Sequence, residues 1–519
     1  MKKYITIFSL LFIFACSEDF LDRPPEDSFT TGNFYTTPDQ LLSTSTYLYA
    51  HTWFDYIDKA AVGIHDVMGG NGRTSDDNIA RFLNFSLTAD YTQIRFAWQS
   101  FFATIAHANS MIINIENGAG SSIESSIRQS VLGEGHFFRA ISYFYLVRLW
   151  GPVPIIEDNS RYTRDPRVPK APVDDVFRFI ISDLEEAIEK LPDQQNSPDR
   201  VDAYSAKALM AQVYLHKATI SGSDEDYAMA AQYAGDVIQN SHYALVPDYS
   251  DLWHPDNNNN VESIFALQWF ACQNDWGTQN SLQAYFAADG TLTEAGDGWG
   301  TVTPTIDLIN SFANNDLRRP ATLMEDGNFY PTIWTDRGGY TYSRYENGNL
   351  KSNTGANIKK HVVGTNKDAE VCFMSTGLNT PLIRYADVLL TFAEATIGNA
   401  NSTTNAEALE AFNQVRVRAG LPTVSQITLE DIMEERRHEF AFEFQAWFDI
   451  LRMYNRDQQS TIEFIAEQER GIIGTEGGNE VVLEEKYAPS PENFVLPMPA
   501  NDAAANPLLL EEPVPYYND

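Results

Sequence analysis

Helix-forming segments of similar length follow one another along the chain, and they constrain the fold more than any other feature. Within residues 173–191 the apolar side chains recur every three or four positions until Pro192 ends the pattern, which is the period of an amphipathic α-helix. We also predict helices over 90–117, 123–150, 203–218, 227–240, 382–398, 405–419 and 428–454. The first helix is expected to begin at Thr37-Pro38-Asp39-Gln40, which has the residue types of an N-terminal capping box.

These segments predict a mainly α fold built from helical hairpins. Residues 203–218 and 227–240 combine alanines with aromatic residues, as in tetratricopeptide-like repeats, although no clean repeat consensus is present. Between Gly290 and Gly364 lie 10 of the 30 glycines, and no helical period is found there. We therefore predict a single body over 38–519, composed of a helical scaffold (about 38–245 and 382–454), an inserted loop-rich part with a few short strands (about 246–381), and an extended tail from 481.

The first 16 residues resemble the signal of a bacterial lipoprotein. Lys2 and Lys3 precede a short apolar run, and the small Ala15 stands directly before Cys16, which is the order of a secretory signal with its cleavage site. The run is shorter than the roughly 20 apolar residues that a membrane-spanning helix needs. We expect removal of the signal peptide 1–15, a lipid anchor on Cys16 and an extended leader over 16–37. An ordinary signal peptide is the alternative.

The remaining chain is strongly acidic. Without residues 1–15, 71 Asp and Glu face 34 Lys and Arg, which gives a net charge of −37. This charge argues against nucleic acid as a partner and against electrostatic docking on anionic lipid. Cys272 and Cys372 both stand among apolar residues. We expect two buried free thiols, with a disulfide between them as the alternative.

Motifs for catalysis are missing from the sequence. It contains no Gly-rich phosphate loop, no His-Glu-x-x-His and no nucleophile elbow, and its nine histidines lack metal-ligand spacing. We interpret His136 as a helix-packing residue. The motif residues Arg384, Asp387, Arg416 and Arg418 are interpreted as members of ion pairs that join scaffold helices. A glycoside hydrolase needs only two suitably spaced carboxylates, so this function stays an alternative in a chain with 71 acids.

Aromatic residues in the loop-rich part suggest a binding surface, because flat rings stack on sugar rings while polar side chains bind the hydroxyls. The candidate ligand-binding residues there are Trp276, Tyr285, Trp299, Trp334, Arg337 and Tyr340. A second candidate is the loop 69–78, where Asn71, Arg73 and Asp76 can bind hydroxyls or the acids can hold a structural Ca²⁺. The glycines of this loop argue against a packed element, and a plain solvent loop is the alternative.

A series of motifs follows a characteristic order along the chain: Cys16 with Asp19-Phe20-Leu21-Asp22, Phe34-Tyr35-Thr36-Thr37-Pro38-Asp39, Gly133 to Ala140, Leu149 to Pro154, Ala206 to Leu215, Arg384 to Leu390, Asn413 to Leu421, Glu435 to Glu443, Trp447 to Arg452 and Leu496-Pro497-Met498-Pro499. In this order the motifs resemble the SusD/RagB outer-membrane lipoproteins of the Bacteroidota over essentially the full length. The chain departs from the family at Phe444 and Ala446, where Gly and Arg are usual, and at Gly135, where Ala is usual. These departures concern packing in scaffold helices.

The resemblance implies a SusD-like α/α fold and a protein that is not an enzyme. Such proteins sit on the extracellular face of the outer membrane, cover a SusC-like TonB-dependent transporter and pass oligosaccharides to it. We expect no metal or cofactor. The resemblance assigns no binding residue, because the ligand-binding loops of the family vary. Peptide capture by the same architecture is the alternative ligand class.

Overall fold

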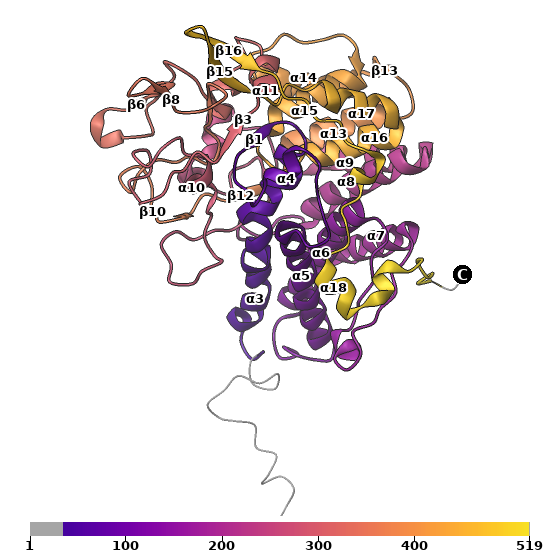
Figure 1. Cartoon of the computed structure of the whole chain (residues 1–519). Helices are drawn as coiled ribbons and strands as arrows, with labels where there is room; N and C mark the ends of the chain where they lie inside the picture. Colours follow the sequence, from indigo (N-terminus) through magenta and orange to yellow (C-terminus); the bar gives the residue numbers. More distant parts are fainter. Residues whose placement is uncertain (1–34, 518–519) are drawn as a thin grey trace, which may run out of the picture.

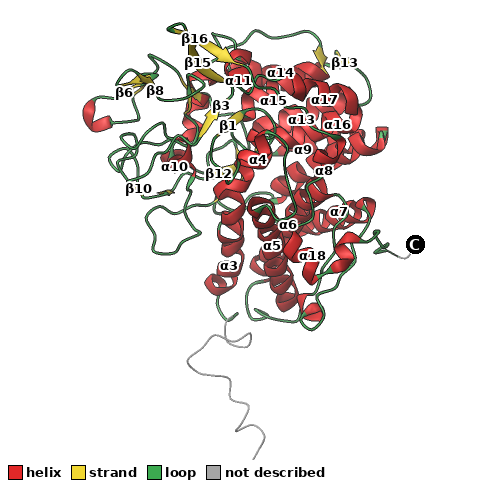
Figure 2. Ribbon diagram, in the orientation of Figure 1, coloured by secondary structure: helices red, strands yellow, loops and turns green. Residues whose placement is uncertain are grey.

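The computed structural model describes residues 35–517, and α-helices dominate it (Figure 1, Figure 2). The predicted signal peptide and Cys16, the predicted site of lipidation, lie outside the described residues. The scaffold helices are α3 (Pro38–Thr46), α4 (Ala80–Leu83), α5 (Thr92–Glu116), α6 (Ser125–Trp150), α7 (Val173–Lys190), α8 (Ala203–Ser221), α9 (Asp224–Asn240), α13 (Tyr385–Ile397), α14 (Ala406–Arg418), α15 (Leu429–Phe440), α16 (Ala446–Arg456) and α17 (Gln458–Glu467). The mainly α fold with paired helices is therefore confirmed.

The helix starts follow from local capping chemistry. The Thr37 hydroxyl accepts the Gln40 backbone N–H while the Gln40 side chain accepts the Thr37 N–H, so the predicted capping box is present. Such reciprocal bonds satisfy donors that the first helical turn leaves unpaired. Asp202 and Ser205 form the same motif at the start of α8.

Consecutive scaffold helices pack side by side. The helix α6 packs between α5 and α7, α8 packs between α7 and α9, and α13 contacts α9 and α14. Helix α6 is buried along most of its length from Ser130 to Trp150, which explains the Phe, Tyr and Leu side chains around its circumference. One hydrophobic cluster extends from these helices to Phe265, Tyr285 and Tyr340, so the loop-rich part shares the scaffold core.

The predicted single helix over 428–454 is wrong, because the chain breaks between α15 and α16. Phe442 and Phe444 in the break have positive φ angles of 63° and 62°. Glycine adopts this left-handed conformation freely, whereas a phenylalanine does so at a cost. Burial of both rings in the core opposes that cost, and the break brings the Glu443 carboxylate into a buried charge network.

The strands are short, antiparallel pairs, and most belong to the loop-rich part. They are β1 (Gly72–Thr74) with β3 (Val302–Pro304), β2 (Ser263–Leu267) with β12 (Thr380–Arg384), β4 (Leu323–Met324) with β9 (Asn357–Ile358), β5 (Phe329–Tyr330) with β6 (Tyr340–Thr341), β7 (Tyr345–Glu346) with β8 (Asn349–Leu350), β10 (Val371–Cys372) with β11 (Ser375–Thr376), β13 (Ser402–Thr403) with β14 (Ile427–Thr428), and β15 (Ile472–Glu476) with β16 (Asn479–Leu483). Arg73 pairs with Thr303, and Phe265 pairs with Ile383. The loop-rich part also contains α10 (Leu282–Phe286), α11 (Ile306–Ser311) and α12 (Arg318–Thr322).

The tail departs from the predicted extended conformation. It begins inside the hairpin β15–β16 and later forms the short helix α18 (Ala500–Ala505), which lies beside the ends of α5 and α6 in Figure 1. Throughout residues 35–517, each helix is too short or too polar to cross a membrane.

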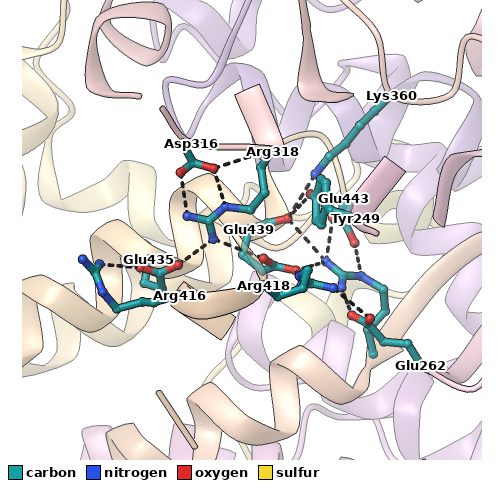
Figure 3. A network of polar contacts seen from close by, with 11 residues as sticks. Tyr249, Glu262, Asp316, Arg318, Lys360, Arg416, Arg418, Glu435, Glu439 and Glu443 are labelled. Atoms are coloured by element: carbon teal, nitrogen blue, oxygen red, sulfur yellow. Dashed lines mark hydrogen bonds and ion pairs between the residues drawn. The ribbon is translucent and has the colours of Figure 1, made fainter. Parts of the chain in front are cut away.

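A buried network of charges joins the loop-rich part to the scaffold (Figure 3). The Arg384 guanidinium contacts Glu443 at 2.7 Å and Glu439 at 3.0 Å, and it also pairs with Glu262. Arg418 of α14 contacts Glu262 at 2.9 Å and also pairs with Glu439. The remaining members are Tyr249, Asp316, Arg318, Lys360, Arg416 and Glu435.

This network settles the interpretation of the basic motif residues. Arg384, Arg416 and Arg418 make structural ion pairs as predicted, and Asp387 pairs with Arg436 of α15 at 2.6 Å. Burial opposes ionisation of Glu439, but the surrounding guanidinium groups of Arg418, Arg384 and Arg318 outweigh it and hold the pKa of that carboxyl well below its usual range.

Candidate functional site

Two exposed tryptophans distinguish the loop-rich surface. Trp276 and Trp299 are 57% and 44% exposed, whereas Tyr285 and Tyr340 are only 5% and 4% exposed. Large apolar rings usually lie inside a folded protein, so an exposed ring held in a fixed position indicates a contact surface. We use the term aromatic face for Trp276, Trp299 and the exposed Phe373, together with the polar groups beside them.

Trp276 stands on a short loop that is closed at its base. The Phe270 N–H donates to the Thr278 carbonyl at 2.8 Å, and the Trp276 ring packs edge-to-face on Phe54 with centroids 5.7 Å apart. Gly277 follows with a φ of 109°, and a Cβ there would lie 3.0 Å from the His51 imidazole. Only glycine fits both the backbone angle and the contact, so the loop lies close against the scaffold and the indole rests on Phe54.

Trp299 is held against α10 and a neighbouring hairpin. The backbone N–H of Trp299 donates to the Ala284 carbonyl at 2.8 Å. Its ring lies 5.5 Å from Tyr285 on one side and 6.1 Å from Phe373, which occupies the turn between β10 and β11. Gly298, with a φ of 93°, approaches so closely that a Cβ would lie 2.6 Å from the Asp289 carbonyl oxygen. Trp299 is thus positioned by two neighbouring rings.

Hydrogen-bonding groups next to these rings come from the scaffold. Asp58 and Lys59 belong to a π-helical segment, η4 (Tyr56–Ala60), and π-helical turns are frequent at functional sites. Ser281 and Tyr285 donate hydrogen bonds to one oxygen of Asp58, at 2.6 and 3.0 Å. The Lys59 ammonium lies 5.1 Å from the Tyr285 ring centroid. A carboxylate and an ammonium therefore stand beside the aromatic face.

The surroundings of Asp58 and Asp76 shift the pKa values of these two carboxyl groups in opposite directions. Burial raises the pKa of Asp58, and the hydrogen bonds from Ser281 and Tyr285 only partly oppose this effect. Asp76 lies 3.2 Å from Lys59. Burial disfavours its charged form, but hydrogen bonds from Asn78 and the Lys59 ammonium outweigh that effect and lower the pKa of Asp76. Asp76, a predicted binding residue, thus lies close to the aromatic face.

Trp334, Arg337 and Tyr340 form a second cluster. The half-buried Trp334 ring contacts Tyr340 edge-to-face, with centroids 4.7 Å apart. The Arg337 guanidinium lies 4.6 Å from the centroid of the Trp334 ring. The indole N–H donates to the Thr291 carbonyl at 3.1 Å, and Arg337 forms an ion pair with Glu294. Among residues 35–517, no ring contact connects this cluster to Trp276 or Trp299.

Asn71 and Arg73 have structural partners, and the prediction that their loop lacks a packed element is wrong. Asn71 is buried, donates to Asp66 at 3.3 Å and accepts from Arg437 at 3.0 Å. Arg73 donates to the Arg470 carbonyl at 2.7 Å, and residues Gly72–Thr74 form strand β1. The glycines that suggested a loop permit close packing, since Gly72 sits against Val302 and Val67.

The prediction of two buried free thiols is also wrong. Cys272 and Cys372 form a disulfide with their Cα atoms 5.3 Å apart, and Cys372 is exposed. Their apolar neighbours include Phe270 and Phe373, which are themselves exposed. The disulfide connects the Trp276 loop to the hairpin that carries Phe373, so it holds two segments of the aromatic face together.

His136 packs between helices as predicted. It is buried, and its Nδ1 lies 2.8 Å from Asp183 of α7, which also binds Arg139. In the described portion of the chain, His, Cys, Asp and Glu side chains nowhere gather in threes in a way that would hold a metal ion.

Sequence reasoning missed Phe54, Asp58, Lys59 and Phe373 at the aromatic face. The scaffold contributes three of them, from a helical stretch that carries no loop-like composition. The sequence identifies Phe373 only as an apolar neighbour of Cys372. The useful signal is the exposure of Trp276 and Trp299, and that exposure depends on contacts between segments more than 200 residues apart, such as Phe54 with Trp276.

Comparison with known proteins reveals similarity along the whole chain. A family model described as "SusD family" matches residues 261–517, and another described as "Starch-binding associating with outer membrane" matches residues 19–215. A SusD-like protein from Bacteroides ovatus is 35% identical over 99% of this chain and 98% of its own length. A crystal structure described as being with a xylogluco-oligosaccharide is 33% identical, with a TM-score of 0.84 over 92% of this chain and 99% of that one. A SusD superfamily protein from Parabacteroides distasonis, 24% identical over 93% of this chain and 98% of its own, has the same fold, with a TM-score of 0.71.

Proposed function

The chain belongs to the SusD family, and from this premise we propose that it binds oligosaccharides at the cell surface through the aromatic face. The observation that carries the proposal is the pair of exposed indoles, Trp276 and Trp299. Trp276 packs against Phe54, and Trp299 packs against Tyr285. Indole faces stack on the apolar faces of pyranose rings. Asp58 and Lys59 contact Tyr285, whose ring neighbours Trp299, and they can accept hydrogen bonds from sugar hydroxyls and donate hydrogen bonds to them.

The ligand class follows from charge and similarity together. The net charge of the full chain is −35, which favours a neutral ligand over an acidic polysaccharide. The structure with a xylogluco-oligosaccharide, 33% identical to this chain, makes xylogluco-oligosaccharides the first probe to use. We propose binding without catalysis and without a metal or cofactor.

The cellular setting that we propose combines a tether with a transporter. Cys16 would carry the lipid anchor on the extracellular face of the outer membrane, and the body would cover a SusC-like TonB-dependent transporter. Tethering raises the effective ligand concentration at the pore, so modest affinity at the aromatic face is sufficient.

The test is the affinity of the purified protein for a xylogluco-oligosaccharide, measured by isothermal titration calorimetry. Changing both Trp276→Ala and Trp299→Ala should weaken binding by about 30-fold or more, because each ring contributes on the order of 1 kcal/mol beyond its buried area. The far-ultraviolet circular dichroism should be unchanged, since both rings are exposed.

Phe464→Ala is the matched control. Phe464 is an exposed aromatic residue of α17, which Figure 1 places on the scaffold away from α10 and β10. Its replacement should leave affinity unchanged. Equal binding by the wild type and the double tryptophan variant would refute the aromatic face as the site, and release of reducing sugar by the wild type would refute binding without catalysis.

A further inference from the structure

An open hollow lies on the scaffold side of the Trp276 loop. It has a volume of about 590 Å³ and is lined by residues of α5 and of the turns that follow α3, which include Tyr47, His51, Asp55, Gln99, Ser100 and His107. The turns are η2 (Tyr47–Tyr49) and η3 (His51–Trp53). Figure 1 shows α3 and α5 side by side, and the two helices are in contact. Small-molecule sites commonly have volumes of about 300–1,000 Å³.

One ring in this hollow is held in the same manner as Trp276 and Trp299. Tyr47 is 43% exposed. Its ring stacks on His107 with centroids 5.0 Å apart and contacts His51 at 4.6 Å. His107 is itself fixed by a 2.8 Å hydrogen bond between its Nε2 and the Thr44 carbonyl. Tyr47 therefore presents a ring of restricted mobility to the hollow, which reduces the entropy lost when a ligand stacks on it.

Polar groups around Tyr47 have hydrogen-bonding capacity that the protein does not use. Ser100 is buried, and its hydroxyl has no hydrogen-bond partner among the described residues. Buried polar groups normally have a partner, and Ser100 is one of the residues that line the hollow, so a small rotation of its side chain would offer this hydroxyl to a ligand. Asp55 and Gln99 are exposed on the rim, where a carboxylate and an amide can accept and donate hydrogen bonds.

The hollow borders the loop that carries Trp276. His51, which lines the hollow, lies directly beneath Gly277, where an added Cβ would be 3.0 Å from the imidazole. Phe54, three residues later, supports the Trp276 ring. Burial and then the negative charge of Asp275 raise the pKa of Tyr47, so the residue before Trp276 is close enough to act on the Tyr47 hydroxyl. One ligand can therefore contact Trp276 and enter the hollow.

From this geometry we propose that the Tyr47 hollow is an accessory carbohydrate subsite, which binds sugar units that extend beyond Trp276 in a long oligosaccharide. The inference rests on the proposed function and adds a length dependence to it. The carboxylate of Asp55 on the rim favours neutral sugars over anionic ones. A short oligosaccharide contacts only the aromatic face, whereas a longer one also stacks on Tyr47.

The test compares two xylogluco-oligosaccharides, one of a single repeat unit and one of several units, by isothermal titration calorimetry. Tyr47→Ala should weaken binding of the long oligosaccharide by about 5-fold, which corresponds to about 1 kcal/mol for one stacked ring, and leave the short one unchanged. Tyr47→Phe keeps the ring and should retain most of the affinity. Gln99→Ala, a change at an exposed position, should weaken only the long ligand.

The outcomes separate the subsite from the proposed function. The accessory subsite is refuted if Tyr47→Ala and Gln99→Ala leave the affinities for the short and the long oligosaccharide unchanged, or weaken both affinities equally. The aromatic face would remain in either case. If the wild type binds neither oligosaccharide, the proposed function is refuted, and the subsite with it. Circular dichroism of each variant checks that the helical body is intact.

Discussion

Trp276 and Trp299 combine two properties that set them apart from the buried rings Tyr285 and Tyr340. Each has a large exposed surface, and each packs against a ring that the core holds in place. A rigid exposed ring loses little conformational entropy on binding, so it contributes more to affinity than a mobile one. At the residue scale, this rigidity is what makes the two tryptophans suitable for stacking on sugars.

Asp66, a buried carboxyl of the scaffold, makes the stability of the protein depend on pH. Asp66 is fully buried, and one of its oxygens accepts the Phe442 N–H at 2.7 Å while the other has no partner among the described residues. Burial raises the pKa of Asp66 to about 7. As the pH rises from 4 to 7, the unfolded chain loses this proton first, so the free energy of unfolding should fall over that range.

Asp66→Asn should remove this dependence. The variant keeps a hydrogen-bond acceptor for Phe442 but cannot ionise, so its stability relative to the wild type should improve by up to roughly 4 kcal/mol between pH 4 and pH 8. Chemical denaturation at the two pH values measures the change. Asp77→Asn, at an exposed position, should show no such gain. A constant difference between Asp66→Asn and the wild type across the range would contradict a raised pKa.

The sequence shows which aromatic residues lie in loops, but it does not show which of them are exposed. The sequence shows an excess of aromatic residues in loops, which drew attention to Trp276 and Trp299. It does not distinguish them from Tyr285 and Tyr340, because all four lie in segments without periodicity, and burial is decided by distant packing partners. Asn71 and Arg73 illustrate the same limit, since their buried partners Arg437 and Arg470 lie more than 360 residues away.

At the scale of elements, helical periodicity predicts where helices form but not where a regular pattern is interrupted. Helices α5 to α9 follow the predicted ranges closely because their apolar positions face fixed neighbours along their whole length. The pattern over 428–454 continues through the break at Phe442 to Phe444, since both rings remain in the core. The break is determined by long-range partners, including Lys360, which contacts Glu443 at 2.8 Å.

The disulfide is the element-scale feature with the clearest consequence for binding. It fixes the Trp276 loop relative to the Phe373 hairpin. The double change Cys272→Ser and Cys372→Ser should weaken oligosaccharide binding by about 5-fold through lost preorganisation, and it should lower the free energy of unfolding by about 3 kcal/mol. Calorimetry and chemical denaturation measure the two effects.

The control for this prediction uses a reductant. Dithiothreitol should bring the affinity of the wild type to that of the double serine variant and leave the variant itself unchanged. Unaltered affinity after complete reduction would show that the two loops keep their positions without the disulfide.

At the scale of the whole molecule, the buried charge network unites the loop-rich segments and the scaffold in a single structure. Five positive and five negative groups meet there from segments that span Tyr249 to Glu443 (Figure 3). Removal of one partner from such a network leaves an uncompensated buried charge, which is strongly destabilising. The network thereby ties segments of the loop-rich part, through Arg318 and Lys360, to α15 and the break that follows it.

The most direct measurement of the central claim is a crystal structure of this protein with a bound xylogluco-oligosaccharide. We predict sugar rings stacked on Trp276 and Trp299, with hydroxyl groups within hydrogen-bond distance of Asp58 or Lys59. Because the rings are already held in place, their positions should change little on binding. An oligosaccharide bound elsewhere on the molecule, with both indoles uncovered, would contradict the aromatic face as the binding site.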